Sequence, residues 1–123
     1  MIDRERNIIV KVGDQEVGFR VDNWVLKQTQ KKTGCKGIID LFTRIGIDDS
    51  NIDMEAFTIL LMESQNEYNH HQKINKIIDE RETSELIDQM GGVINALQAL
   101  SEGFETFIPK NSQPPQMVGE TSQ

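Results

Sequence analysis

The apolar and polar positions near the start of the chain predict a β-hairpin. Residues 8–12 (IIVKV) are mostly β-branched, and Val17, Phe19 and Val21 alternate with other residues after the turn-forming residues 13–16 (GDQE). Alternation places these three side chains on one face of the second strand. Because an isolated two-stranded hairpin is marginally stable in water, we expect helices to cover that face.

Three helices are predicted in the middle of the chain. The first follows an N-cap at Asp22 or Asn23, carries two lysines in its last turn and ends at Gly34. A short amphipathic helix over residues 38–45 comes next, before Gly46. A third helix has acidic residues in its first turn and an apolar stripe at helical spacing, formed by Met54, Phe57, Leu60, Leu61, Ser64 and Tyr68.

The longest helical pattern lies further along. Residues 69–82 are polar apart from a narrow seam formed by Ile74, Ile77 and Ile78. A cap at Thr83 or Ser84 is then expected to start a helix whose apolar stripe runs from Leu86 to Leu100. The pair Gly91-Gly92 lies inside this stripe, where glycine is unfavourable. Two explanations stay open, a helix break or the close approach of another backbone.

These elements predict an α+β fold, mostly α, in which an N-terminal β-hairpin is followed by four to five helices. All three prolines lie in the segment IPKNSQPPQMVGETSQ, which has few apolar residues. Such a segment gains little from burial to offset the entropy of ordering it. We therefore expect one domain over residues 1–108 and a disordered C-terminal tail over residues 109–123.

The distribution of charge argues against nucleic-acid binding. Residues 1–34 contain 7 Lys/Arg and 5 Asp/Glu, whereas residues 35–123 contain 6 and 15, in line with the net charge of −7. An acidic surface repels phosphate backbones, and the few aromatic residues are not interleaved with basic ones. A single cysteine suits a reducing compartment, and no stretch has the length of a membrane span. We expect a cytoplasmic protein that binds neither nucleic acid nor membrane.

Candidate reactive residues favour structural roles. Cys35 follows the helix-ending Gly34 beside Lys36, which could activate a thiol, but no motif ties it to a histidine acting as a base. His70 and His71 are adjacent and point about 100° apart on a helix, although Glu67 and His71 have the i, i+4 spacing of helical metal ligands. We expect no catalytic residue, no metal and no cofactor.

A second acidic group resembles a calcium loop only loosely. Asp48, Asp49, Asn51 and Asp53 lie close together, but the glycine and the closing glutamate of such a loop are missing. Helix capping is the favoured role for these residues.

The end of the last apolar stripe is the predicted partner-binding surface. Most of the stripe is expected to be core, but its C-terminal end lies beside the predicted tail, where an apolar helix face can receive a partner. The predicted contacts are Leu97, Leu100, Phe104 and Phe107. The oligomeric state stays open, and a homo-oligomer is one alternative.

The order of elements over roughly residues 7–68 resembles the tail assembly chaperones of long-tailed bacteriophages. These are small acidic α+β proteins in which a strand pair leads into a helix that ends in a Lys-Thr-Gly-like turn. Here the corresponding features are the hairpin, the helix after Asp22, its stop at Lys31-Lys32-Thr33-Gly34, the short helix over residues 38–45 and the helix from Met54 to Tyr68. Residues 69–123 fall outside the resemblance.

The resemblance implies a non-enzymatic protein of the host cell cytoplasm. It implies binding to the tape measure protein, a very long and aggregation-prone helical chain, until tail tube subunits polymerise around that chain. The tail tube protein is a further candidate partner. One alternative is an oligomeric virion component, such as a head–tail connector or a tail completion protein. Another is a small enzyme or metal protein that uses Cys35, His70 or His71.

Overall fold

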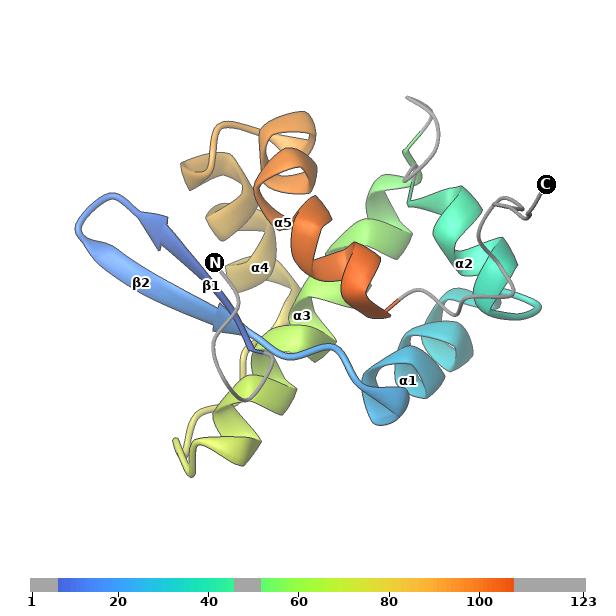
Figure 1. Ribbon diagram of the computed structural model, residues 1–123, viewed down its shortest axis with the longest axis horizontal. Coiled ribbons are helices and arrows are strands. Elements are labelled where there is room, and N and C mark those ends of the chain that lie inside the picture. The colour runs from blue at the N-terminus through green and yellow to red at the C-terminus, as the bar shows by residue number, and fades with distance from the viewer. Residues whose placement is uncertain (1–6, 46–51, 108–123) are drawn as a thin grey trace, which may run out of the picture.

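The structure is a computed structural model that describes residues 7–45 and 52–107 (Figure 1), except for the side chains of residue 102 and residues 104–107. These residues form an antiparallel two-stranded hairpin followed by five helices, which confirms the predicted α+β class. The expected tail, residues 109–123, lies outside the described residues. The elements are β1 (Ile8–Val12), β2 (Gln15–Phe19), α1 (Asn23–Thr33), α2 (Ile38–Arg44), α3 (Met54–His71), α4 (Glu80–Gln89) and α5 (Val93–Phe107).

The turn of the hairpin is shorter than the predicted turn over residues 13–16. Val12 pairs with Gln15, so only two residues connect the strands. Gly13 has φ 63° at the first position of this turn, a conformation that glycine adopts without steric cost and that matches the twist of a tight hairpin. Gln15 and Glu16 therefore belong to β2. Phe19 is fully buried at the end of that strand, as the alternation predicts.

The central element is α3, which contacts β2, α1, α2 and α4 (Figure 1). Its N-cap is Asp53, whose side chain accepts a hydrogen bond from the Ala56 N–H at 3.1 Å. The sequence predicts a single buried stripe, but neighbours on several sides bury residues all around the middle of this helix. The buried residues are Ala56, Phe57, Thr58, Ile59, Leu60, Leu61, Glu63, Ser64, Gln65 and Glu67. Met54, at the start of the predicted stripe, is exposed.

The predicted helix from Leu86 to Leu100 is in fact two helices. α4 ends at Gln89, and Gly91 and Gly92 have φ values of 98° and 103°. Glycine adopts such positive angles readily whereas other residues do so rarely, so this pair ends α4 and turns the chain into α5. The structure therefore has the helix break, one of the two explanations that the sequence leaves open.

The start of α4 also differs from the prediction. Asp79 is the N-cap, and a capping box joins the Asp79 side chain to the Glu82 backbone N–H and the Glu82 side chain to the Asp79 backbone N–H. Thr83, predicted as a cap, is instead fully buried within the helix, where its hydroxyl lies 2.9 Å from Gln65 Oε1. Ser84 is likewise inside α4 and is exposed.

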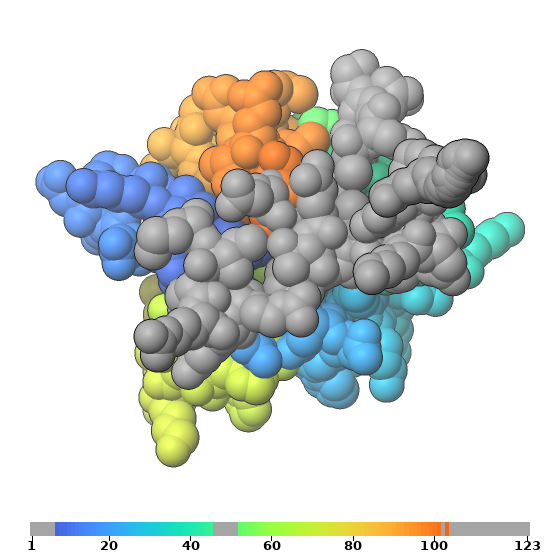
Figure 2. Space-filling model, viewed as in Figure 1, coloured from blue at the N-terminus to red at the C-terminus, as the bar shows by residue number. Residues whose placement is uncertain are grey.

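The chain after α3 has no regular secondary structure up to α4. The Asn66 side chain holds it, because Asn66 donates to the Ile78 carbonyl at 3.0 Å and accepts from the Ile78 N–H at 2.7 Å. Ile74 and Ile77, two members of the predicted apolar seam, remain exposed. Figure 2 shows the end of α3 and this segment projecting from the body of the molecule.

Candidate functional site

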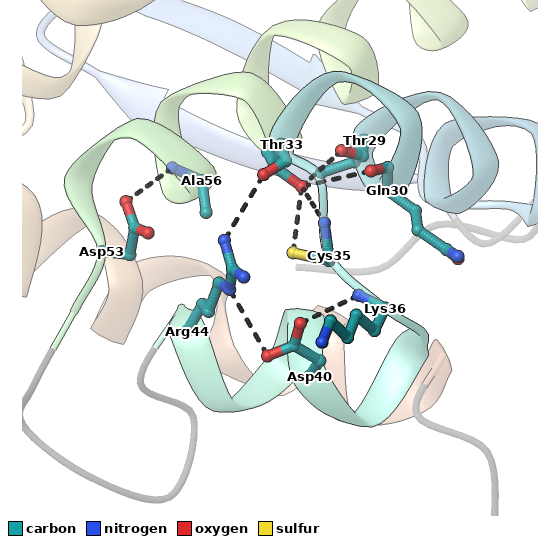
Figure 3. Close-up of polar contacts among 9 residues, drawn as sticks. All are labelled: Thr29, Gln30, Thr33, Cys35, Lys36, Asp40, Arg44, Asp53 and Ala56. Carbon is teal, nitrogen blue, oxygen red and sulfur yellow. Dashed lines mark hydrogen bonds and ion pairs between the residues drawn. The ribbon is translucent and has the colours of Figure 1, made fainter.

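Cys35 lies in the turn between α1 and α2 and is buried (Figure 3). Gly34 caps α1 in the left-handed conformation, as predicted. The Thr33 hydroxyl donates to the Thr29 carbonyl at 2.7 Å and lies 2.9 Å from Cys35 Sγ. A thiol in this position packs as a small apolar group at the helix end.

Polar contacts around Cys35 join the end of α1 to α2 (Figure 3). Arg44 donates to the Thr33 carbonyl and forms an ion pair with Asp40, both at 3.4 Å. Asp40 also accepts from the Lys36 N–H at 2.9 Å, and this hydrogen bond is the largest cause that lowers the pKa of the Asp40 carboxyl. Thr33, Asp40 and Arg44 therefore each have a structural partner in this network.

The histidines lie at the opposite end of α1 from Cys35. His71 is within 3.9 Å of Asp22, the residue that caps the start of α1, whereas Cys35 follows its end. A cysteine nucleophile needs a base within hydrogen-bonding reach. The fold keeps these two residue types apart.

Three ionisable side chains meet at the start of α1, and we call them the α1–α3 cluster: Asp22, Glu67 and His71. His71 Nε2 lies 3.2 Å from Glu67 Oε2 and 3.9 Å from Asp22 Oδ2. Asp22 Oδ1 accepts from the Val25 N–H at 3.1 Å, and Arg20 Nε lies 3.4 Å from Asp22 Oδ2. The cluster thus links the end of the hairpin and α1 to the last turn of α3.

The pKa values of the two carboxyl groups in the α1–α3 cluster are shifted in opposite directions. Burial, the hydrogen bond with Asp22 and the negative charge of Asp22 raise the pKa of Glu67 to about 7. Burial also opposes ionisation of Asp22, but hydrogen bonds from Glu67 and the Val25 N–H, together with Arg20, outweigh it and lower the Asp22 pKa. Glu67 therefore keeps a proton, which it shares with an ionised Asp22, up to a higher pH than an ordinary glutamate does.

A concavity of about 410 Å³ opens beside this cluster. Glu63, on one wall, forms an ion pair with Lys32 of α1, and Asn66 is held by the Ile78 backbone. The rings of His70 and His71 pack edge to face with centroids 5.7 Å apart. The lining residues are Trp24, Glu63, Asn66, Glu67, His70 and His71.

Substituting Glu67 with glutamine tests the shared proton. The folded protein holds a proton on Glu67 that the unfolded chain releases near its ordinary pKa of 4.5. This contribution to stability is complete below that pH and is lost as the pH rises toward 7. Glu67→Gln keeps a donor to Asp22 without the titration. We expect the variant to be about 1–2 kcal/mol more stable than the wild type at pH 8, and within about 0.5 kcal/mol of it at pH 5.

Urea unfolding at both pH values, with EDTA present so that only protons titrate the cluster, provides the measurement. An equal difference between the two proteins at pH 5 and pH 8 would contradict the shared proton.

Sequence reasoning found only part of this cluster. The i, i+4 spacing of Glu67 and His71 is visible in the sequence, but Asp22 is recognisable only as a helix cap. No local spacing places Asp22 against α3, because that contact depends on how α1 packs. Asp53, weighed as part of a calcium-like loop, caps α3 as expected. Its neighbours Asp48, Asp49 and Asn51 lie outside the described residues.

The predicted partner contacts on α5 differ in how far they are buried. Leu100 is fully buried in the core, so it presents no surface in this monomer, and Leu97 is partly buried against the core. The side chains of Phe104 and Phe107 lie outside the part of the chain that the structure describes. Among the described residues, other large apolar side chains are exposed, and only Ile94 of these lies on α5. They are Trp24, Ile39, Met54, Ile74, Ile77 and Ile94.

Within residues 7–45 and 52–107, no helix combines the length and apolar character needed to cross a bilayer.

Comparisons with known proteins identify no relatives of this chain. No protein-family model, curated protein or solved structure matches this chain.

Proposed function

We propose that this protein is a non-enzymatic tail assembly chaperone of a long-tailed bacteriophage. It binds the tape measure protein through apolar side chains on its helices and keeps that long chain soluble until the tail tube forms around it. The observation that carries the proposal is the exposure of large apolar side chains on α1, α2 and α3. Trp24 is 55% exposed, Ile39 61% and Met54 64%.

Single exposed apolar residues are common, so their distribution matters more than their existence. Here they lie on several helices, and they include the one tryptophan of the chain, beside the concavity near the α1–α3 cluster. Burying a side chain of this size stabilises a contact by about 1.5–3 kcal/mol. A few such contacts give binding that is reversible, as a chaperone requires.

The arrangement of reactive groups supports binding rather than catalysis. Cys35 is buried among structural partners, and α1 separates it from the histidines. The net charge of −7 disfavours self-association and keeps a protein soluble when its surface is partly apolar.

Trp24 allows a direct test, because its fluorescence reports on its own environment. Helical peptides from the tape measure protein of the same phage should shift the emission of Trp24 to shorter wavelength as the indole becomes buried. Trp24→Ala should weaken peptide binding, measured by calorimetry, by about tenfold or more. Gln30→Ala, an exposed polar position on the same helix, is the matched control and should bind as the wild type does.

Unchanged emission at saturating peptide, or equal affinity of the Trp24→Ala variant, would argue against α1 as a binding surface. Light scattering of the free protein addresses the alternative of a head–tail connector or tail completion protein. A stable closed ring of fixed subunit number would favour that alternative.

A further inference from the structure

We propose that the α1–α3 cluster is a binding site for one divalent transition-metal ion, with Asp22, Glu67 and His71 as ligands and zinc as the best fit. The candidate ligand atoms are Asp22 Oδ2, Glu67 Oε2 and His71 Nε2, and one atom from each residue lies within 4.8 Å of the others. The inference does not depend on the proposed chaperone function.

The spacing of these atoms fits a small tetrahedral ion. Zinc binds imidazole nitrogen and carboxylate oxygen at about 2.0–2.2 Å, which places neighbouring ligand atoms about 3.3–3.6 Å apart. The distances from His71 Nε2 are 3.2 Å to Glu67 and 3.9 Å to Asp22. All three atoms lie within 4.8 Å of one another, so side-chain adjustments of up to about an ångström bring them to bonding distance.

The backbone already holds the three ligands in place. Glu67 and His71 lie one turn apart on α3, so their side chains project from the same face. Asp22 is fixed as the cap of α1, where its other carboxylate oxygen accepts from the Val25 N–H. An ion here would connect two helices that pack against each other.

The chemistry of the ligand set selects among metals. Binding displaces the proton that Glu67 shares with Asp22, so that two carboxylates balance the charge of a divalent ion. A neutral imidazole favours zinc, cobalt or nickel over magnesium and calcium, which prefer oxygen alone. Arg20, 3.4 Å from Asp22 Oδ2, competes with a metal for that oxygen. Asp22 is therefore expected to be the weakest of the three ligands.

The concavity leaves one coordination position open. Glu67 and His71 also line the space beside Trp24, so the fourth ligand would be water or a group that enters from that side. His70 lines the same space, but its side chain projects from α3 in a different direction from that of its neighbour His71. This difference makes His70 a matched control for His71.

The test is a titration of zinc into the full chain, stripped with chelator, at pH 7.5. We expect one ion per chain with a dissociation constant of about 10 μM or tighter, a range that corresponds to about −7 kcal/mol. His71→Ala and Glu67→Gln should each weaken binding at least tenfold. His70→Ala should leave it within about threefold. Cobalt in place of zinc should give the visible absorption of a four-coordinate ion.

A folding control keeps the variants interpretable. Circular dichroism should show that each variant is folded, and zinc should raise the melting temperature of the wild type and of His70→Ala but not that of His71→Ala. Zinc binding weaker than about 100 μM, or equal losses in the two histidine variants, would overturn the proposal.

Discussion

Replacing Ile59 with alanine is expected to destabilise the protein by about 2–4 kcal/mol. Ile59 is only 6% exposed on α3, although it lies outside the apolar stripe that the sequence predicts for this helix. Removing its branched side chain leaves a cavity and loses the favourable transfer of that side chain from water. A loss of this size is a large part of the 5–15 kcal/mol that holds a typical domain together.

Met54→Ala is the control on the same helix. Met54 is 64% exposed, so its truncation should change the free energy of unfolding by about 0.5 kcal/mol or less. Urea unfolding of both variants gives the comparison. A larger loss of unfolding free energy in Met54→Ala than in Ile59→Ala would contradict the structure. It would mean that α3 buries only the stripe that its sequence pattern predicts.

Gly18→Ala is expected to cost about 2 kcal/mol, because the ring of Tyr68 lies against the backbone of β2. A β-carbon at Gly18 would be only 2.3 Å from Tyr68 Cζ, so the ring must shift to admit it. The glycine thus lets the hairpin approach α3 closely.

A double mutant separates this collision from any general effect of alanine in a strand. If the ring causes the loss, Gly18→Ala should cost almost nothing in a Tyr68→Ala background, so that the two changes are far from additive. Additive losses in thermal or urea unfolding would show that Tyr68 does not limit this position.

Local signals in the sequence predict much of the first half of the fold. Asp22 and Asp53 cap α1 and α3, and Gly34 ends α1 with φ 74°. Each of these features depends on the chemistry of one short segment, namely a side chain that accepts from the first turn or a glycine that adopts a left-handed conformation. The alternation in β2 correctly places Phe19 in the core.

Features that depend on packing could not be predicted in this way. Nothing in the pattern of α3 shows that helices and strands surround it, because a buried polar residue such as Gln65 resembles a solvated one. Gln65 is buried, and the Thr83 hydroxyl of α4 lies 2.9 Å from its Oε1. The contact between Asp22 and His71 likewise depends on packing, because 49 positions separate the two residues in the sequence.

The two ends of α1 therefore have different characters. Cys35 and its polar neighbours fasten one end to α2, whereas the other end carries the exposed Trp24 and the α1–α3 cluster. Aromatic side chains are enriched in the cores of protein–protein interfaces, and Trp24 is exposed here. On this basis the chaperone proposal assigns client contact to the side of α1 that carries Trp24.

Co-expression with the proposed client, a tape measure protein, tests the proposed function most directly. The soluble fraction of that long chain should rise several-fold when this protein is present, and the two should copurify. The Trp24→Ala variant should reduce both effects, while Gln30→Ala should not. A tape measure protein that stays insoluble, or that is soluble without copurifying with this chain, would show that the protein is not its chaperone.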